Sequence, residues 1–190
     1  MRARVVEVHR TNYTVQCEGR EKIAVVRGSF HVAGHFPVVG DIVRVEPIDG
    51  NQLVITDIQP RSSVITRKSA HGDEEQTVVA NVDLIMIVMG LDKDFNISRL
   101  ERYLLLAKAS NITPIVVLNK LDISTDSEHQ LKQVEAVVGR VPVVTVSALT
   151  GTGMVDLGEY LNDNVTAVLL GSSGAGKSTI TNWLLKAEVQ

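Results

Sequence analysis

The amino-acid sequence predicts an all-β domain over residues 1–66, followed by an α/β domain over residues 67–190. In the first part, short segments that alternate apolar and polar residues are separated by glycines, as in strands joined by tight turns. From residue 83 onward, continuous apolar runs alternate with segments of helical spacing, which is typical of a parallel sheet covered by helices. The last apolar run leads directly into a glycine-rich segment at residues 171–178.

Five strands are expected in the first domain, at residues 4–9, 12–17, 22–26, 41–45 and 52–56. The turn residues that separate them are Gly19, Gly28, Gly34, Gly40 and Asp49-Gly50. Five short strands in about sixty residues fit a small barrel of the OB type. An SH3-like barrel is a competing interpretation on strand count alone. Residues 61–77 are polar and charged, so we expect an interdomain connection there, part of it mobile.

In the second domain, strands are expected at residues 83–89, 114–118, 141–146 and 165–170. Helices are expected at 97–110, 127–138, 154–161 and 177–186. The run Leu84–Met89 is apolar throughout, as expected for a strand that is buried on both faces. Alternation of such strands with helices predicts a parallel α/β sheet, whose ligands bind at the carboxyl ends of the strands.

Charge is unevenly distributed along the chain. Residues 1–70 hold ten Lys and Arg and seven acidic residues, a net charge of +3, so the remainder carries −6 of the total of −3. A basic end on an acidic body suggests contact with nucleic acid, although ordinary solvated strand faces explain it equally well. The one cysteine, Cys17, excludes a disulfide framework, and there is no apolar run of 18 residues. We therefore expect a cytoplasmic protein without a membrane segment.

The segment Gly171-Ser172-Ser173-Gly174-Ala175-Gly176-Lys177-Ser178 fits G-x-x-x-x-G-K-[ST], the phosphate-binding loop. Its glycines let successive backbone N–H groups point inward, and the following helix adds its positive N-terminal dipole. We expect Lys177 to stabilise the charge of the β- and γ-phosphates, which is its catalytic role. The Ser178 hydroxyl is expected to bind Mg²⁺, and Thr179 to complete the nucleotide site.

Two further segments follow predicted strands at their carboxyl ends. Asn119-Lys120-Leu121-Asp122 is typical of guanine recognition, because the Asp122 carboxylate can accept two hydrogen bonds from guanine that adenine does not offer. Asn119 can tie its loop to the phosphate loop, and the Lys120 stem can lie over the base. In Ser147-Ala148, the small Ala148 lets a backbone N–H approach the guanine oxygen. A simpler interpretation makes Asp122 a helix cap.

The order of these motifs is reversed relative to ordinary GTPases, in which the phosphate loop comes first. The chain resembles the circularly permuted GTPases, specifically the ribosome small-subunit-dependent GTPase A family. The segments that carry this resemblance are 37–43, 60–62, 80–83, 100–104, 119–122 and 171–179. The resemblance implies an OB-fold domain, a permuted P-loop GTPase sheet, binding of GTP or GDP with Mg²⁺, and a monomer when complete. It also implies a role in late maturation of the small ribosomal subunit, with its rRNA as partner.

The resemblance further implies segments that these 190 residues do not contain: the switch segment, the D-x-x-G segment and a zinc-binding module. We therefore expect an incomplete chain, with zinc only in that module, and an α/β sheet that is also incomplete. The strand at 165–170 would then be an exposed apolar edge, which predicts poor solubility unless a partner or second copy covers it. The five histidines, His31 and His35 included, show no metal-ligand spacing.

Three functions remain open at this point. The first is a GTP hydrolase that acts in ribosome assembly, with its activity in the complete protein. The second is an RNA- and guanine-nucleotide-binding module without turnover, which the missing segments favour for this chain itself. The third is an adenine-specific P-loop ATPase, which requires Asn119 and Asp122 to be coincidental.

Overall fold

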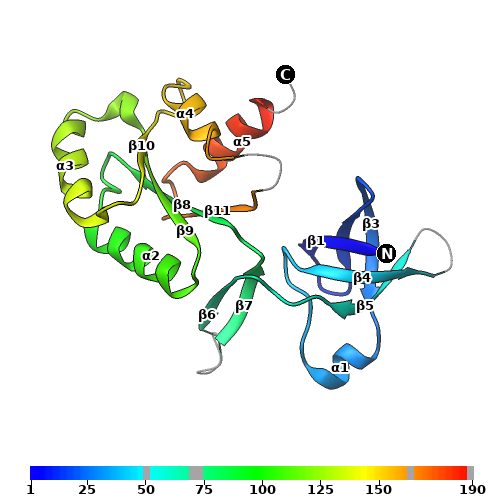
Figure 1. The fold of residues 1–190 in the computed structure, drawn as a ribbon. Coiled ribbons are helices and arrows are strands. Elements are labelled where there is room, and N and C mark those ends of the chain that lie inside the picture. Colours follow the sequence, from blue (N-terminus) through cyan, green and yellow to red (C-terminus); the bar gives the residue numbers. More distant parts are fainter. Residues whose placement is uncertain (49–51, 69–74, 162–164, 188–190) are drawn as a thin grey trace. The chain divides into compact units, whose positions relative to one another are not determined.

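The structure is a computed structural model that describes residues 1–48, 52–68, 75–161 and 165–187 (Figure 1). The chain divides into two compact units, Met1–Val82 and Asp83–Gln190. This division falls at the start of the α/β sheet, whereas the sequence places the domain boundary at 66/67. The boundary at 66/67 stays a prediction.

The first unit contains a closed five-stranded barrel with strand order β1-β2-β3-β5-β4. Its strands β3 and β5 pair in parallel, and the other neighbours are antiparallel. This order, with a helix between the third and fourth strands, is that of the OB fold and confirms the prediction over the SH3-like alternative. The elements are β1 (Arg2–Val8), β2 (Tyr13–Cys17), β3 (Arg20–Val26), α1 (Ser29–Ala33), β4 (Ile42–Pro47) and β5 (Leu53–Ile58).

Alternate residues of these strands fill the barrel, and Val5, Val15, Val43 and Ile55 are among its buried side chains. Helix α1 was not expected, because five residues are too few to show a helical period. It ends at Gly34, whose φ of 67° is the left-handed conformation common at helix C-termini. The expected turn at Asp49-Gly50 lies outside the described residues.

The connection expected at 61–77 contains strands that the sequence analysis did not predict. Strands β6 (Val64–Lys68) and β7 (Glu75–Ala80) pair as an antiparallel two-stranded sheet. Polar and charged residues at 66–68 and 75–77 interrupt the apolar–polar alternation that would indicate strands. Among the residues of these strands whose burial the structure describes, only Ile65 and Ala80 are buried. Most of the charged run from His71 lies outside the described residues, so the expected mobility stays a prediction.

The second unit is a parallel four-stranded sheet in the order β10-β9-β8-β11, which confirms the predicted α/β class. Its strands are β8 (Leu84–Gly90), β9 (Thr113–Asn119), β10 (Val143–Thr145) and β11 (Ala167–Leu170). The helices are α2 (Ile97–Ala109), α3 (Ser127–Val138), α4 (Met154–Gly158) and α5 (Lys177–Ala187), and the unpredicted 3-10 helix η1 spans Leu121–Ile123. In the sheet described here, β11 pairs with β8 alone.

Sheet strands β8 and β9 are buried over nearly their whole length, as the continuous apolar runs predict. Met86, Val88 and Val117 of these strands pack with Met154 and Ile180 in one core cluster. This core fixes the carboxyl ends of β8, β9 and β11 at one edge of the sheet, where the candidate site lies. Among the described helices, none is long and apolar enough to cross a membrane.

Candidate nucleotide-binding site

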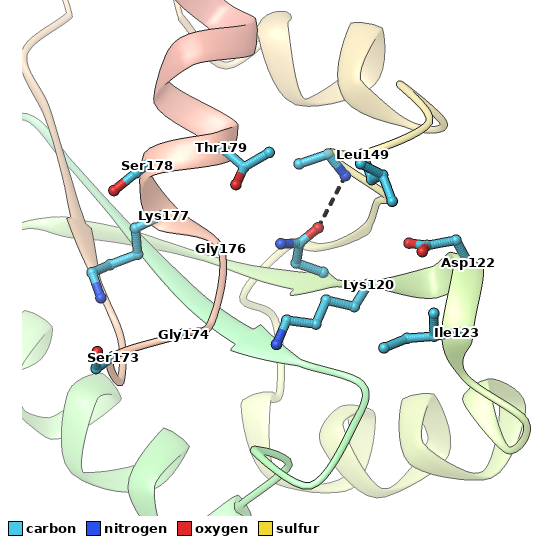
Figure 2. A pocket seen from close by; sticks show the side chains of 12 residues that line it. Lys120, Asp122, Ile123, Leu149, Ser173, Gly174, Gly176, Lys177, Ser178 and Thr179 are labelled. Atoms are coloured by element: carbon cyan, nitrogen blue, oxygen red, sulfur yellow. Dashed lines mark hydrogen bonds between the residues drawn. The ribbon is translucent and has the colours of Figure 1, made fainter.

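A cavity of about 590 Å³ opens at the carboxyl edge of the parallel sheet. Figure 2 shows Asp122, Ile123 and Leu149 at one end of this cavity and Ser173, Lys177 and Ser178 at the other. The predicted residues that line it are Asn119, Lys120, Asp122, Ala148, Ser173, Gly174, Gly176, Lys177, Ser178 and Thr179. The other predicted residues belong to the same loops but are not among the lining residues: Ser147, Gly171, Ser172 and Ala175. Ile123 and Leu149 were not predicted.

The phosphate loop runs from the end of β11 into α5, the strand–loop–helix setting that the motif requires. Gly174 and Gly176 adopt φ values of +82° and +97°, which side-chain-bearing residues rarely adopt. Lys177 turns back over the loop, and its Nζ donates to the carbonyl oxygens of Gly171 at 2.9 Å and Ser172 at 2.7 Å. The lysine ammonium is thus held directly against the curled backbone.

Asn119 joins the phosphate loop to the loop after β10. Its side chain is buried, with Nδ2 donating to the Ala175 carbonyl at 2.9 Å and Oδ1 accepting from the Ala148 N–H at 3.0 Å. The dashed line in Figure 2 marks the second of these bonds. A Cβ at Gly176 would lie 2.1 Å from Asn119 Nδ2, so only glycine lets the amide reach Ala175. The Ala148 N–H, which the sequence assigns to the guanine oxygen, donates to Asn119 in this structure.

Asp122 projects from η1 at the opposite end of the cavity from the phosphate loop. Its Oδ1 accepts from the Ser147 hydroxyl at 2.5 Å. Ser147 is buried, and its oxygen also accepts from the Thr150 N–H at 3.2 Å, which orients the hydroxyl proton toward Asp122. Asp122 itself is exposed. One carboxylate oxygen is therefore held by the protein, while the side chain stays accessible to a ligand.

Lys120 adopts the left-handed conformation, with φ of 69°, at the point where β9 turns into η1. Its Nζ donates to Asp92 Oδ2 at 2.8 Å, so its alkyl stem crosses the cavity wall. The hydrogen bond from Lys120 lowers the pKa of Asp92 below its ordinary value. Asp92 follows β8, and the sequence analysis did not single it out.

Asp94, two residues further along the same turn, contacts the phosphate loop. Its carboxylate accepts from the Ser172 hydroxyl at 2.6 Å and from Arg99 Nη1 at 2.5 Å. Burial pushes the pKa of Asp94 upward, but the hydrogen bonds from Ser172 and Arg99 outweigh it and the net shift is downward. A general rule could have found both aspartates: polar residues just past a buried parallel strand lie at the ligand edge of the sheet.

Within the described residues, no group of three or more His, Cys, Asp or Glu side chains is placed to hold a metal ion. The Ser178 hydroxyl lies on the cavity wall at the start of α5. One hydroxyl fits Mg²⁺, which commonly takes one or two protein ligands and completes its shell with phosphate oxygens and water.

Fold and site together define a P-loop nucleotide-binding domain with the motif order of a circularly permuted GTPase, joined to an OB-fold barrel. The family described as RsgA GTPase matches residues 58–190, and the chain belongs to this family. The resemblance found in the sequence is thereby confirmed.

Curated relatives and solved structures agree with this assignment. A small ribosomal subunit biogenesis GTPase RsgA from Methanosarcina acetivorans is 40% identical, with 98% of this chain and 51% of that protein aligned. A second, RsgA 2 from Lactiplantibacillus plantarum, is 39% identical over 98% of this chain and 54% of its own length. The crystal structure of YjeQ from Thermotoga maritima superposes with a TM-score of 0.81 at 29% identity, covering 96% of this chain and 64% of that one. The chain spans about half the length of the curated relatives it matches.

Proposed function

We propose that this chain binds guanine nucleotide with Mg²⁺ and belongs to a protein that hydrolyses GTP to assist late maturation of the small ribosomal subunit. The observation that carries the proposal is the single cavity that joins the phosphate loop to Asp122. The relatives are named small ribosomal subunit biogenesis GTPases, which supports the partner and the cellular process. A ribosomal partner of this kind supports a cytoplasmic location for the protein.

The phosphate end of the cavity supplies charge stabilisation. Backbone N–H groups of the phosphate loop and the N-terminus of α5 would donate to a bound diphosphate or triphosphate, and the Lys177 ammonium would move from the two loop carbonyls to phosphate oxygens. Ser178 would supply a hydroxyl ligand to Mg²⁺, and the bound ion would supply neutralisation of charge on the phosphate oxygens. Lys177 is the residue of this chain that we assign to catalysis.

The base end of the cavity supplies specificity. Asp122, oriented by Ser147, accepts hydrogen bonds from the ring N–H and exocyclic amino group of guanine. Adenine offers neither of these donors, so the Asp122 carboxylate would keep its bond from Ser147 but gain none from the base. The Lys120 stem covers one face of the base, and Ala148 keeps the guanine edge uncrowded. This complementarity favours a GTPase over the adenine-specific alternative.

A titration with GDP and ADP in Mg²⁺ buffer tests the base assignment. We expect a clear preference for GDP, and Asp122→Asn is expected to abolish it because the amide cannot accept two hydrogen bonds in the same geometry. Asp126→Asn, an exposed aspartate four residues further along the same loop, is the matched control and should keep the preference. Undiminished GDP affinity in Asp122→Asn would show that the base site is assigned wrongly.

Hydrolysis requires a separate test, because a non-hydrolysing RNA- and guanine-nucleotide-binding module is the alternative. Phosphate release from GTP is measured with and without purified small ribosomal subunits, for this chain and for a chain of the relatives' length. Stimulated release in the longer chain supports the GTPase, whereas nucleotide binding without release in both supports the module.

A further inference from the structure

We propose that the turn between β8 and α2, residues 91–95, is a positioning element that aligns the two halves of the nucleotide site. It holds the base-recognition loop through Asp92 and the phosphate loop through Asp94. The inference rests on the proposed function, because it concerns how the same site is kept in its working geometry. It assigns a role to two residues that lie outside the motifs and outside the cavity lining.

The phosphate side is held through Ser172. Asp94 accepts from the Ser172 hydroxyl at 2.6 Å, while the Ser172 carbonyl accepts from Lys177 Nζ at 2.7 Å. Ser172, which follows the first glycine of the phosphate loop, is therefore held at its hydroxyl by Asp94 and at its carbonyl by Lys177. A shift of Ser172 would move the backbone that Lys177 rests on.

The base side is held through Lys120. Its ammonium is bound to Asp92 at 2.8 Å, and Asp122 follows two residues later in the same loop. Lys120 has a left-handed backbone, a conformation that is unfavourable for a residue with a side chain. The ion pair to Asp92 is one of the contacts that can offset this cost and keep the Asp122 loop in place.

Hydrogen bonds within the turn hold Asp92 and Asp94 in a fixed arrangement, so the contacts to Lys120 and Ser172 are fixed relative to each other. The Asp94 N–H donates to Asp92 Oδ1 at 3.0 Å, and the Phe95 N–H donates to the Asp92 carbonyl at 2.9 Å. At its start, the Leu91 N–H donates to the Asn119 carbonyl at 2.8 Å. Two aspartates so near a phosphate site would repel the ligand if uncompensated, but each is paired with a cation, Asp94 with Arg99 and Asp92 with Lys120.

Two affinity ratios, measured by calorimetry in Mg²⁺ buffer, separate the two contacts. GMP lacks the β-phosphate, so the GDP-to-GMP ratio reports the phosphate loop, while the GDP-to-ADP ratio reports the base loop. For Asp94→Asn and Ser172→Ala we expect the GDP-to-GMP ratio to fall about tenfold, equivalent to about 1.4 kcal/mol, with the GDP-to-ADP ratio unchanged. For Asp92→Asn we expect the reverse pattern.

A merely structural role would lower all affinities together and leave both ratios constant. Because Asp94 and Ser172 act through one hydrogen bond, the double variant should lose no more than the larger single effect. Glu101→Gln, an exposed carboxylate on α2, is the control and should leave both ratios unchanged. If Asp94→Asn does not fold, Ser172→Ala removes only a hydroxyl and keeps the test decisive.

The proposal is overturned if the Asp94 and Ser172 variants keep the wild-type GDP-to-GMP ratio, or if Asp92→Asn keeps the GDP-to-ADP ratio. Failure of the proposed function looks different, because the wild-type protein would then show no preference for GDP over ADP. The wild-type ratios therefore test the function, and the changes among variants test the positioning role.

Discussion

Replacing Gly176 by alanine is expected to damage the site through a single contact. The new Cβ would lie 2.1 Å from Asn119 Nδ2, so the amide must retreat and lose its bond to the Ala175 carbonyl. Leaving those buried polar groups without partners costs about 1–3 kcal/mol. The φ of +97° adds about 1–2 kcal/mol for any residue with a side chain. The expected loss is therefore about 2–5 kcal/mol, a large part of a typical domain's stability of about 5–15 kcal/mol.

Urea unfolding followed by the fluorescence of Trp183, the one tryptophan of the chain, measures this loss in the α/β unit. Two matched glycines separate the causes. Gly174 has a φ of +82° but open space around its Cβ position, so Gly174→Ala should cost only the strain of about 1–2 kcal/mol. Gly158 has neither a positive φ nor a close neighbour, so Gly158→Ala should cost nothing.

The reasoning fails if Gly176→Ala destabilises the unit no more than Gly174→Ala does. That result would mean that the Asn119 amide adapts at no cost, and that the close contact does not constrain the loop. An additional Asn119→Ala substitution gives an independent check, because it removes the clash and its hydrogen bonds together. In that background, Gly176→Ala should fall to the cost of Gly174→Ala.

Three further outcomes are expected. In the first unit, Asp41→Asn should cost about 1.5–3 kcal/mol, because it weakens the charge-assisted hydrogen bonds between buried Asp41 and half-buried Arg61. Faster hydrogen exchange in β4 measures this loss, and the control Asp57→Asn, at an exposed position, should leave exchange unchanged. The pKa of Asp94 in the folded protein lies below its ordinary 3.8, so the ionised carboxylate stabilises the fold above that pH and loses this contribution as pH falls toward the folded pKa. In Asp94→Asn, the free energy of unfolding should therefore decrease less steeply with falling pH over this range. Lys177→Met should weaken GDP binding about 10–100-fold by calorimetry, the loss of one charge-assisted hydrogen bond to phosphate.

Most of the architecture could be predicted because its strands and helices carry local sequence patterns several residues long. The apolar runs of β8 and β9, the helical period of α2 and the glycine spacing of the phosphate loop are all local signals. Elements without such a signal were missed. Helix α1 is too short for a period, and the β6–β7 pair becomes visible only once its two strands face each other.

The site was predictable as a set of motifs but not as a set of contacts. Asp92 and Asp94 belong to no motif, and their partners Lys120 and Ser172 are 28 and 78 residues away along the chain. Likewise, the sequence suggests that Ala148 offers its N–H to a ligand, whereas the structure joins it to Asn119. Such pairings depend on which loops the sheet brings together, which no local pattern contains.

The reversed motif order is compatible with one nucleotide site because the motifs meet at the carboxyl edge of the sheet, whatever their order along the chain. Asn119 reaches Ala175 over 56 residues, and Asp94 reaches Ser172 over 78. In the described sheet, β11 pairs only with β8, and all four of its residues are half-buried, so backbone pairing holds the phosphate-loop strand from one side. The side-chain contacts from Asn119 and Asp94 therefore carry more of the loop's placement than they would beside a strand paired on both edges. This is why we expect single substitutions at these contacts to change nucleotide affinity.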